Sequence, residues 1–390
     1  MPLPVRNSVT NFMTAGAIFC TCLFLLTSCS HAEDEKEGHI ASSEINAGDH
    51  GSTKATTGEA LKPKNLKGDI KPIKTTGLSD RYLFATSQQA IDIVISEDDY
   101  TAQLQPTEIG IKTRNSKNLT LPSLQENYSG GILPWSDNEK TALVHAINSI
   151  QTNVTQYEQH LPKTILMAKT SQAIEGGLPH TRANLILFSQ DSLDQYFLTA
   201  LKDKQKALDN LANLFLHELH HILSRYNDKQ QDAYFSLIGF KPCNFIEPKT
   251  LRALRLTNPD APVYKHFVPV SPIRNTNANG VIPFLRVTGP YDNQEKGSLG
   301  DYFDFSLLAI EESEGTCGLA KNKNKPDGEP VFLSGGAVPD FFKAIGSNTQ
   351  YIIHPEEILA ENFIFSVRGR KDLPNPEIPE KISIFWNNLE

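Results

Sequence analysis

The sequence has no excess of basic residues and lacks two common catalytic signatures. Lysine and arginine together number 37 against 45 aspartates and glutamates, which gives a formal net charge of -8 over 390 residues. Nucleic-acid-binding surfaces are usually marked by clustered basic charge, so we expect no nucleic-acid partner. Neither a Walker-type phosphate loop nor a GxSxG nucleophile elbow occurs. The length is ample for one large domain or two modest ones.

Long apolar runs are also scarce, and the run at residues 13–27 is too short and too early for an ordinary transmembrane span. Such a run is typical of a secretory signal. It ends in Leu26-Thr27-Ser28-Cys29, which resembles the bacterial lipobox, whose cysteine becomes the lipidated first residue. The resemblance implies a signal peptide over 1–28 and a lipid-anchored protein of the bacterial cell envelope. Ser30 in place of aspartate favours the outer membrane, facing the periplasm or the surface. A secreted protein with an unmodified Cys29 is the alternative.

Residues 29–78 contain few apolar side chains among Gly, Ser, Thr, Lys, Glu and Asp. Such a segment cannot bury enough surface to fold. We therefore expect a flexible tether that holds a single folded domain, residues 79–390, away from the membrane.

Cysteine is rare in that domain, where only Cys243 and Cys317 of the five cysteines lie. Two cysteines in an oxidising compartment favour one disulfide. Two buried free thiols are the alternative. Neither cysteine has the CxxC or Cys/His spacing of a metal site.

A buried helix is predicted over residues 203–226, because no proline or glycine interrupts the segment and its apolar residues recur at helical spacing. It contains His217-Glu218-Leu219-His220-His221, an HExxH motif. Residues four apart share a helix face, so His217 and His221 can bind one metal ion. Glu218 is placed to take a proton from a water molecule at that ion. The alternative is a structural histidine cluster without metal.

Two histidines leave a zinc shell incomplete, so a further protein ligand is required. The metzincin continuation is absent, because Ser224 and Asn227 stand where its glycine and third histidine would be. A helix predicted to begin at Pro355 instead places Glu357 and Glu361 on one face. The competing ligand candidates are Glu356, Glu361, Asp232 and Glu247.

These two motifs resemble those of the HExxH zinc metallopeptidases, specifically the gluzincins, whose later element is ExxxD. The resemblance implies Zn²⁺ bound by His217, His221 and Glu357, with Glu361 supporting a histidine from behind. The sequence departs from the family in having glutamate as the second acid, and in the long gap between the motifs.

The resemblance also implies hydrolysis of a peptide or protein substrate, with Glu218 as the general base. An oxyanion donor is needed as well, and gluzincins take it from the C-terminal part. Tyr351 and His354 are the candidates, with Tyr302 behind them. No GxMEN motif is present to bind a free N-terminus, so an endopeptidase is expected.

The fold expected is α+β and zincin-like: a small sheet with an edge strand over the HExxH helix, a mostly irregular or β C-terminal lobe, and the ligand-bearing helix. An exposed strand edge can pair with an extended peptide, and Asn184–Phe188 is the candidate for that edge. An ordinary core strand is the alternative there. The pattern further predicts a helix at 137–160, strands at 164–168 and 183–188, one or two strands within 82–111, a helix within 245–256, and a loop at 122–134.

Two other functions remain open at this stage. One is a lipid-anchored binding protein with a structural metal, whose shell is closed by a fourth ligand such as His220 or His354. The other is a zinc hydrolase that acts on cell-wall peptides.

Overall fold

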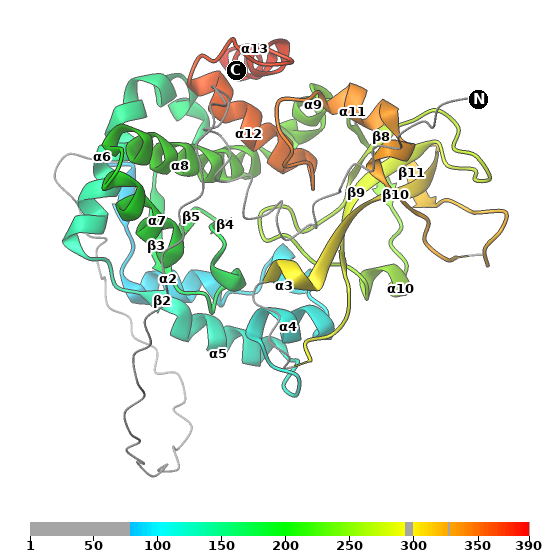
Figure 1. Ribbon diagram of the computed structural model, residues 1–390, viewed down its shortest axis with the longest axis horizontal. Helices are drawn as coiled ribbons and strands as arrows, with labels where there is room; N and C mark the ends of the chain where they lie inside the picture. The colour runs from blue at the N-terminus through cyan, green and yellow to red at the C-terminus, as the bar shows by residue number, and fades with distance from the viewer. Residues whose placement is uncertain (1–78, 293–298, 327, 390) are drawn as a thin grey trace, which may run out of the picture. The chain divides into compact units, whose positions relative to one another are not determined.

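The structure is a computed structural model that describes residues 79–292, 299–326 and 328–389 (Figure 1). The expected signal peptide, the lipidation site Cys29 and the tether at 29–78 lie outside the described residues. Within the three described ranges, no helix combines the length and apolar character needed to cross a membrane.

The first sheet has the strand order β1-β3-β5-β4. Its central strands are parallel, and β4 pairs with β5 in the antiparallel direction. The strands are β1 (Tyr82–Phe84), β2 (Ile132–Leu133, paired with β3), β3 (Ile165–Thr170), β4 (His180–Arg182) and β5 (Leu185–Ser189). The strand predictions at 164–168 and 183–188 are therefore confirmed.

The prediction of Asn184–Phe188 as the edge strand is wrong. This segment forms β5, which lies between β3 and β4, so that the three-residue β4 is the edge. A strand of three residues shows no apolar periodicity, which is why the sequence did not reveal it.

Side chains of the central strands are buried on both faces of this sheet. Ile165 and Met167 of β3 join a core formed with α6 (Asp137–Val154) and α8 (Lys204–Tyr226). The intervening Leu166 packs on the opposite face against α2 (Ser87–Val94) and α5 (Leu121–Gly131). This alternation follows from the two-residue period of a strand. The predicted helix at 137–160 is confirmed as α6 followed by a 3₁₀ turn.

The prediction of strands within 82–111 is correct only for β1, because α2, α3 (Asp99–Gln103) and α4 (Pro106–Thr113) follow it. The Thr86 side chain accepts a hydrogen bond from the Gln89 backbone, and the Gln89 side chain accepts one from the Thr86 backbone. This capping box fixes the beginning of α2. The apolar residues that looked strand-like bury one helical face instead.

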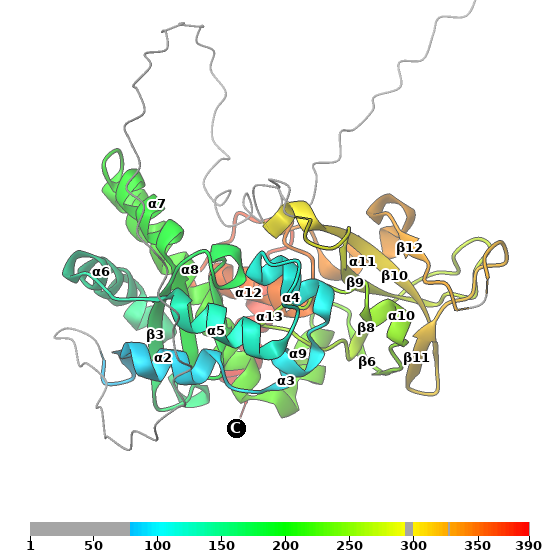
Figure 2. The ribbon, with the colours of Figure 1, turned by 90° about the horizontal axis from the view of Figure 1, so that it is seen from below.

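The loop predicted at 122–134 is also wrong, because most of it is the helix α5. Thr120 caps this helix by accepting a hydrogen bond from the Ser123 backbone, and Pro122 lies in the first turn, where a missing N–H costs nothing. Figures 1 and 2 show α2 to α5 gathered along one side of the first sheet.

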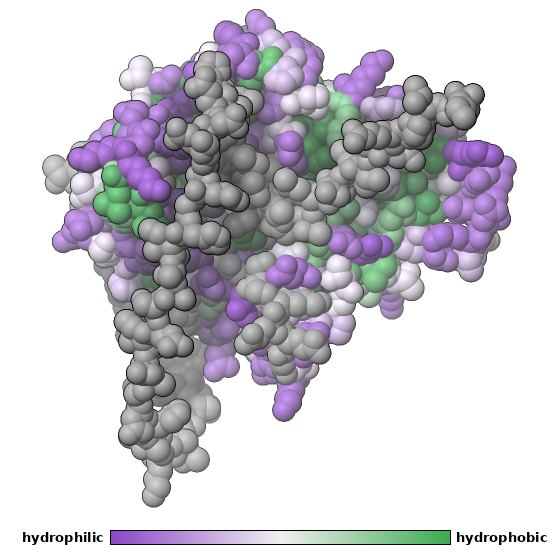
Figure 3. All heavy atoms as spheres, in the orientation of Figure 1, coloured by the Kyte–Doolittle hydropathy of each residue, from purple (hydrophilic) through white to green (hydrophobic). Residues whose placement is uncertain are grey.

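A second, largely antiparallel sheet lies in the C-terminal part, for which a mostly irregular or β lobe is expected. Its order is β6-β8-β9-β10-β11-β7, with β12 on β10. Its strands are β6 (Lys241–Pro242), β7 (Asn244–Phe245), β8 (His266–Pro269), β9 (Gly280–Val287), β10 (Phe303–Ser313), β11 (Thr316–Leu319) and β12 (Phe332–Leu333). Figure 3 shows apolar surface gathered over this sheet and α11. Cys243 and Cys317 form a disulfide that joins the β6–β7 segment to β11.

The remaining helices are α7 (Gln190–Ala200), α9 (Gln231–Ser236), α10 (Lys249–Arg252), α11 (Pro339–Ile345), α12 (Pro355–Val367) and α13 (Glu377–Asn387). The predicted helix beginning at Pro355 is confirmed as α12, which packs between α8 and α13. The helix expected within 245–256 is reduced to the single turn α10. The described chain is thus a mixed helix-and-sheet fold with α8 at its centre.

Candidate metal centre

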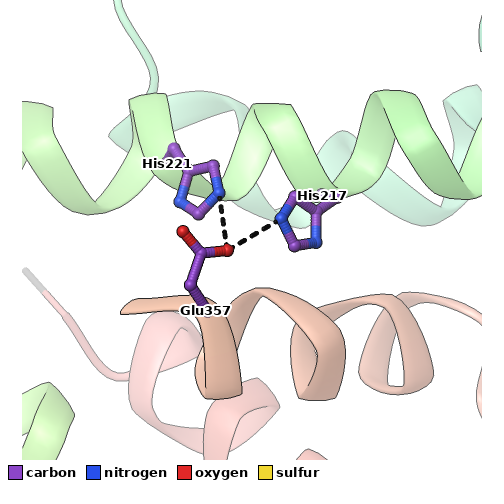
Figure 4. A group of neighbouring side chains, drawn as sticks. All are labelled: His217, His221 and Glu357. Atoms are coloured by element: carbon purple, nitrogen blue, oxygen red, sulfur yellow. Dashed lines mark hydrogen bonds and ion pairs between the residues drawn. The ribbon is translucent and has the colours of Figure 1, made fainter. Parts of the chain in front are cut away.

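Three predicted ligands meet where α8 crosses α12. Oε2 of Glu357 lies 3.0 Å from Nε2 of His217 and 3.4 Å from Nε2 of His221. Figure 4 shows both rings projecting from α8 towards this one carboxylate oxygen. All three residues are buried, and their candidate ligand atoms lie within 4.8 Å of one another. His217, His221 and Glu357 could therefore hold a metal ion.

The spacing fits a small divalent ion. Ligand atoms about 2.0–2.1 Å from a tetrahedral zinc are separated by roughly 3.3 Å, which is close to both measured distances. The two imidazoles lie edge to face, with ring centroids 4.7 Å apart, and Nε2 of each ring faces the same oxygen of Glu357. The donor set of two imidazoles and one carboxylate is one that zinc uses in catalytic sites.

Each of the two histidines is also supported from behind by α12. Glu361 Oε1 lies 3.1 Å from Nδ1 of His217, which is the supporting geometry predicted for this residue. Glu356 Oε1 lies 3.3 Å from Nδ1 of His221, and Ser224 donates a hydrogen bond to the other oxygen of Glu356. Such partners fix the orientation of a ligating ring and raise its basicity.

The charge of the cluster calls for a cation. Glu218, Glu356, Glu357 and Glu361 are all buried, and in the described part of the chain they face the imidazoles of three histidines, His217, His220 and His221. Buried carboxylates need a compensating charge. Burial alone would lower the pKa of His217, but hydrogen bonds with Glu357 and Glu361 raise it to about 10. A metal must therefore displace a proton from His217, so the metal affinity should fall as the pH decreases below about 10.

Glu218 differs from the other buried glutamates because its Oε2 has no hydrogen-bond partner among the described residues. Burial raises the pKa of this carboxyl to about 8. A buried carboxylate oxygen without a partner is uncommon in native proteins. A water molecule at the metal would supply the missing partner, which is the role predicted for Glu218.

The oxyanion candidates have different surroundings. Tyr351 stacks beside His217, with ring centroids 5.8 Å apart at 29°. His354 caps α12, where its Nδ1 accepts a hydrogen bond from the Glu356 backbone, and its ring also bonds the Val263 backbone. Tyr302 packs against Tyr291 in the apolar cluster that also contains Tyr351. Tyr351 thus has a ring contact with a candidate ligand, His217.

Two competing ligand candidates are paired elsewhere. Asp232 Oδ1 lies 2.7 Å from Nε2 of His266, and Glu247 binds the guanidinium of Arg255. His220 faces Glu356 at 3.5 Å, and its other ring nitrogen lies 3.1 Å from the Tyr234 hydroxyl. His220 therefore lies with Glu356, in a second group with His221 that could hold a metal, and not at the oxygen of Glu357 that His217 and His221 share.

Two polar residues at the centre were missed by the sequence analysis. Nδ2 of Asn258 donates a hydrogen bond of 2.6 Å to Oε1 of Glu357. Asp260 places a carboxylate oxygen within 4.8 Å of candidate ligand atoms of Glu218 and His221. Both residues lie in an irregular segment between α10 and β8, where no periodicity gives a signal.

A buried ion pair between Lys112 of α4 and Glu175 holds the beginning of that segment. The ammonium of Lys112 binds the Glu175 carboxylate and also donates to the Thr257 backbone carbonyl at 3.2 Å. Glu108, one turn earlier on α4, accepts hydrogen bonds from the backbone and hydroxyl of Thr257. The position of Asn258, the next residue, therefore depends on α4.

We expect Lys112→Met to lower the free energy of unfolding by about 3–5 kcal/mol at neutral pH, because it leaves the buried Glu175 without its cation. Burial would raise the pKa of Glu175, but Lys112 outweighs this and holds it below the usual 4.5. The stabilisation is therefore complete above pH 4.5 and is lost as the pH falls through the folded pKa. Urea denaturation should show a smaller difference from the parent in acid.

The exposed pair Lys325–Glu329 offers the matched control. Lys325→Met should change stability by less than about 1 kcal/mol at either pH, since exposed ion pairs contribute little. A Lys112→Met protein as stable as the parent would contradict a structural role for the buried pair.

No protein-family profile, curated protein sequence or solved structure matches this chain. Its function must therefore be argued from the residues themselves.

Proposed function

We propose that the protein is a zinc-dependent endopeptidase with a zincin-like, gluzincin-type centre. One observation carries the proposal: a single oxygen of Glu357 lies 3.0 and 3.4 Å from the two histidines of an HExxH helix. The buried Glu218 beside them has one carboxylate oxygen, Oε2, without a hydrogen-bond partner among the described residues, which supports a hydrolytic centre because a purely structural site would have no use for it. The antiparallel edge strand β4, which contacts α8, supports a zincin-like arrangement.

Zinc bound at this centre would lower the pKa of a water molecule and polarise a substrate carbonyl. The positive ion would also favour the ionised form of Glu218, whose pKa burial raises. Glu218 then accepts a proton from water and passes it to the leaving amine. Tyr351 is the donor that we assign to the oxyanion, because its ring lies against His217.

The N-terminal sequence supports a location in the bacterial cell envelope. The apolar run and the Leu-Thr-Ser-Cys ending are those of a lipoprotein signal, with lipid on Cys29. We propose that the lipid holds the catalytic domain at the outer membrane, where its substrate is an exposed segment of a peptide or protein.

Cleavage of an unbiased peptide library by the zinc-loaded protein tests the proposal. We expect cleavage at internal bonds, which a zinc chelator abolishes and added zinc restores. Release of terminal residues alone would contradict endopeptidase action. Activity confined to cell-wall peptides would favour the hydrolase that acts on the cell wall. A protein that holds zinc and cleaves no peptide of either kind would refute the proposal in favour of a structural metal.

A further inference from the structure

We infer that residues 258–262, here called the strap, close the substrate cleft beside the metal centre and must be displaced before an extended peptide can bind. This inference deepens the proposed function and rests on it. The strap has the sequence Asn-Pro-Asp-Ala-Pro and lies between α10 and β8. Four observations support this inference.

The first concerns the free side of the edge strand. The Thr181 backbone N–H points away from β5 and donates a hydrogen bond of 2.8 Å to Oδ1 of Asp260. The Thr181 hydroxyl donates to the same oxygen. A peptide that adds to a sheet edge needs such outward backbone groups for its own carbonyls. Asp260 therefore accepts the hydrogen bond that a substrate carbonyl would accept from β4.

The second is contact with the metal centre itself. Asn258 binds the oxygen of Glu357 that does not face the histidines, at 2.6 Å. Asp260 approaches Glu218 and His221, with the candidate ligand atoms of all three within 4.8 Å. The strap thus binds the candidate ligand Glu357 and lies near the candidate base Glu218, where a scissile peptide bond would have to lie.

The third is the position of the strap between two hollows. Pro259 and Asp260 line both a small hollow, which Tyr351 also lines, and a larger one, which Glu356 also lines. Thr181 of β4 lines the larger hollow, and its neighbour His180 lines the smaller one. The strap thus forms a wall shared by two hollows that both reach β4.

The fourth is the way in which the strap is held. Its first neighbour, Thr257, is fixed by Glu108 and Lys112 of α4. Within the strap, Asp260 donates its backbone N–H to the Asn258 side chain at 2.9 Å, an internal contact that holds no other element. Pro259 has no N–H to offer to β4. After the strap, the backbone of Val263 is bonded by the His354 ring. Between these two ends, the strap is held by polar contacts of Asn258 with Glu357 and of Asp260 with Thr181 and with Arg225 of α8. A substrate can replace such polar contacts.

Hydrogen exchange of the Thr181 amide in the full-length, zinc-loaded chain tests the inference. We expect Asp260→Ala to accelerate this exchange by at least about tenfold, because the amide loses its acceptor and the edge is uncovered. Asn258→Ala, which leaves Asp260 in place, serves as a second variant and should accelerate exchange less. Asp228→Ala removes an exposed carboxylate from the wall of the larger hollow and is the matched control. Unchanged exchange in Asp260→Ala would overturn the inference.

The rate at which the chelator dipicolinate removes zinc is a second readout. If the strap covers the metal centre, zinc should be removed faster from Asp260→Ala than from the parent or the control. For a peptide that the parent cleaves, kcat/KM should rise several-fold in Asp260→Ala. Faster exchange combined with an unchanged or lower kcat/KM would overturn a closing role. Hydrogen exchange and zinc removal do not depend on hydrolysis. A protein that cleaves nothing would therefore refute the proposed function, while these two measurements would still show whether the strap covers β4 and the metal centre.

Discussion

A Glu218→Gln protein should bind zinc as the parent does and lose hydrolysis by about 10²–10⁴-fold, the usual contribution of a positioned general base. Glu218 is not one of the three candidate ligands His217, His221 and Glu357, so a glutamine at position 218 should leave the metal in place. The amide has nearly the same shape but cannot accept a proton. The loss should therefore appear in kcat, with little change in KM.

The measurement is a kinetic comparison of zinc-loaded proteins with their zinc content determined in parallel. Glu380→Gln, which changes an exposed carboxylate on α13, is the control and should match the parent in both respects. Activity that survives in Glu218→Gln would remove Glu218 from the role of base. Loss of zinc in the same variant would show that Glu218 is a ligand.

Zinc affinity should depend on the carboxylates of α12 in a fixed order. We expect Glu357→Ala to cause the largest loss, because it removes a direct ligand. Glu361→Gln and Glu356→Gln should each weaken binding by about 10–100-fold, since each carboxylate supports the outer nitrogen of one ligand histidine. Competition with a chromogenic chelator at constant pH measures all three.

Asp232→Asn is the matched control for this series. Asp232 and His266 form a histidine–carboxylate pair of the same chemistry, at 2.7 Å, outside the cluster. Loss of the Asp232 carboxylate should leave zinc affinity unchanged. A loss from Glu361→Gln equal to that from Glu357→Ala would reverse the assignment of ligand and support.

The parts of the centre that lie on helices could be predicted from the sequence. His217 and His221, and likewise Glu357 and Glu361, are four residues apart, and a helix places such pairs on one face whatever the rest of the fold does. The support of His221 by Glu356 could not be predicted, because it depends on the way α12 crosses α8. No spacing within one segment encodes that crossing.

The incorrect or missing predictions share one physical cause, which is that the segments concerned are short. The apolar residues of α2 fit a strand as well as a helix over so few positions, and the capping box at Thr86 decided the outcome. The edge strand β4 has only three residues. The strap has no periodicity at all, so Asp260 and its contact with Thr181 required the three-dimensional structure.

A crystal of the zinc-replete protein, measured on both sides of the zinc absorption edge, tests the centre most directly. We predict one anomalous peak about 2.0–2.2 Å from Nε2 of His217, Nε2 of His221 and the carboxylate of Glu357. No peak at this place, or a peak among His220, His221 and Glu356 alone, would contradict a metal held by the two ligand histidines and Glu357.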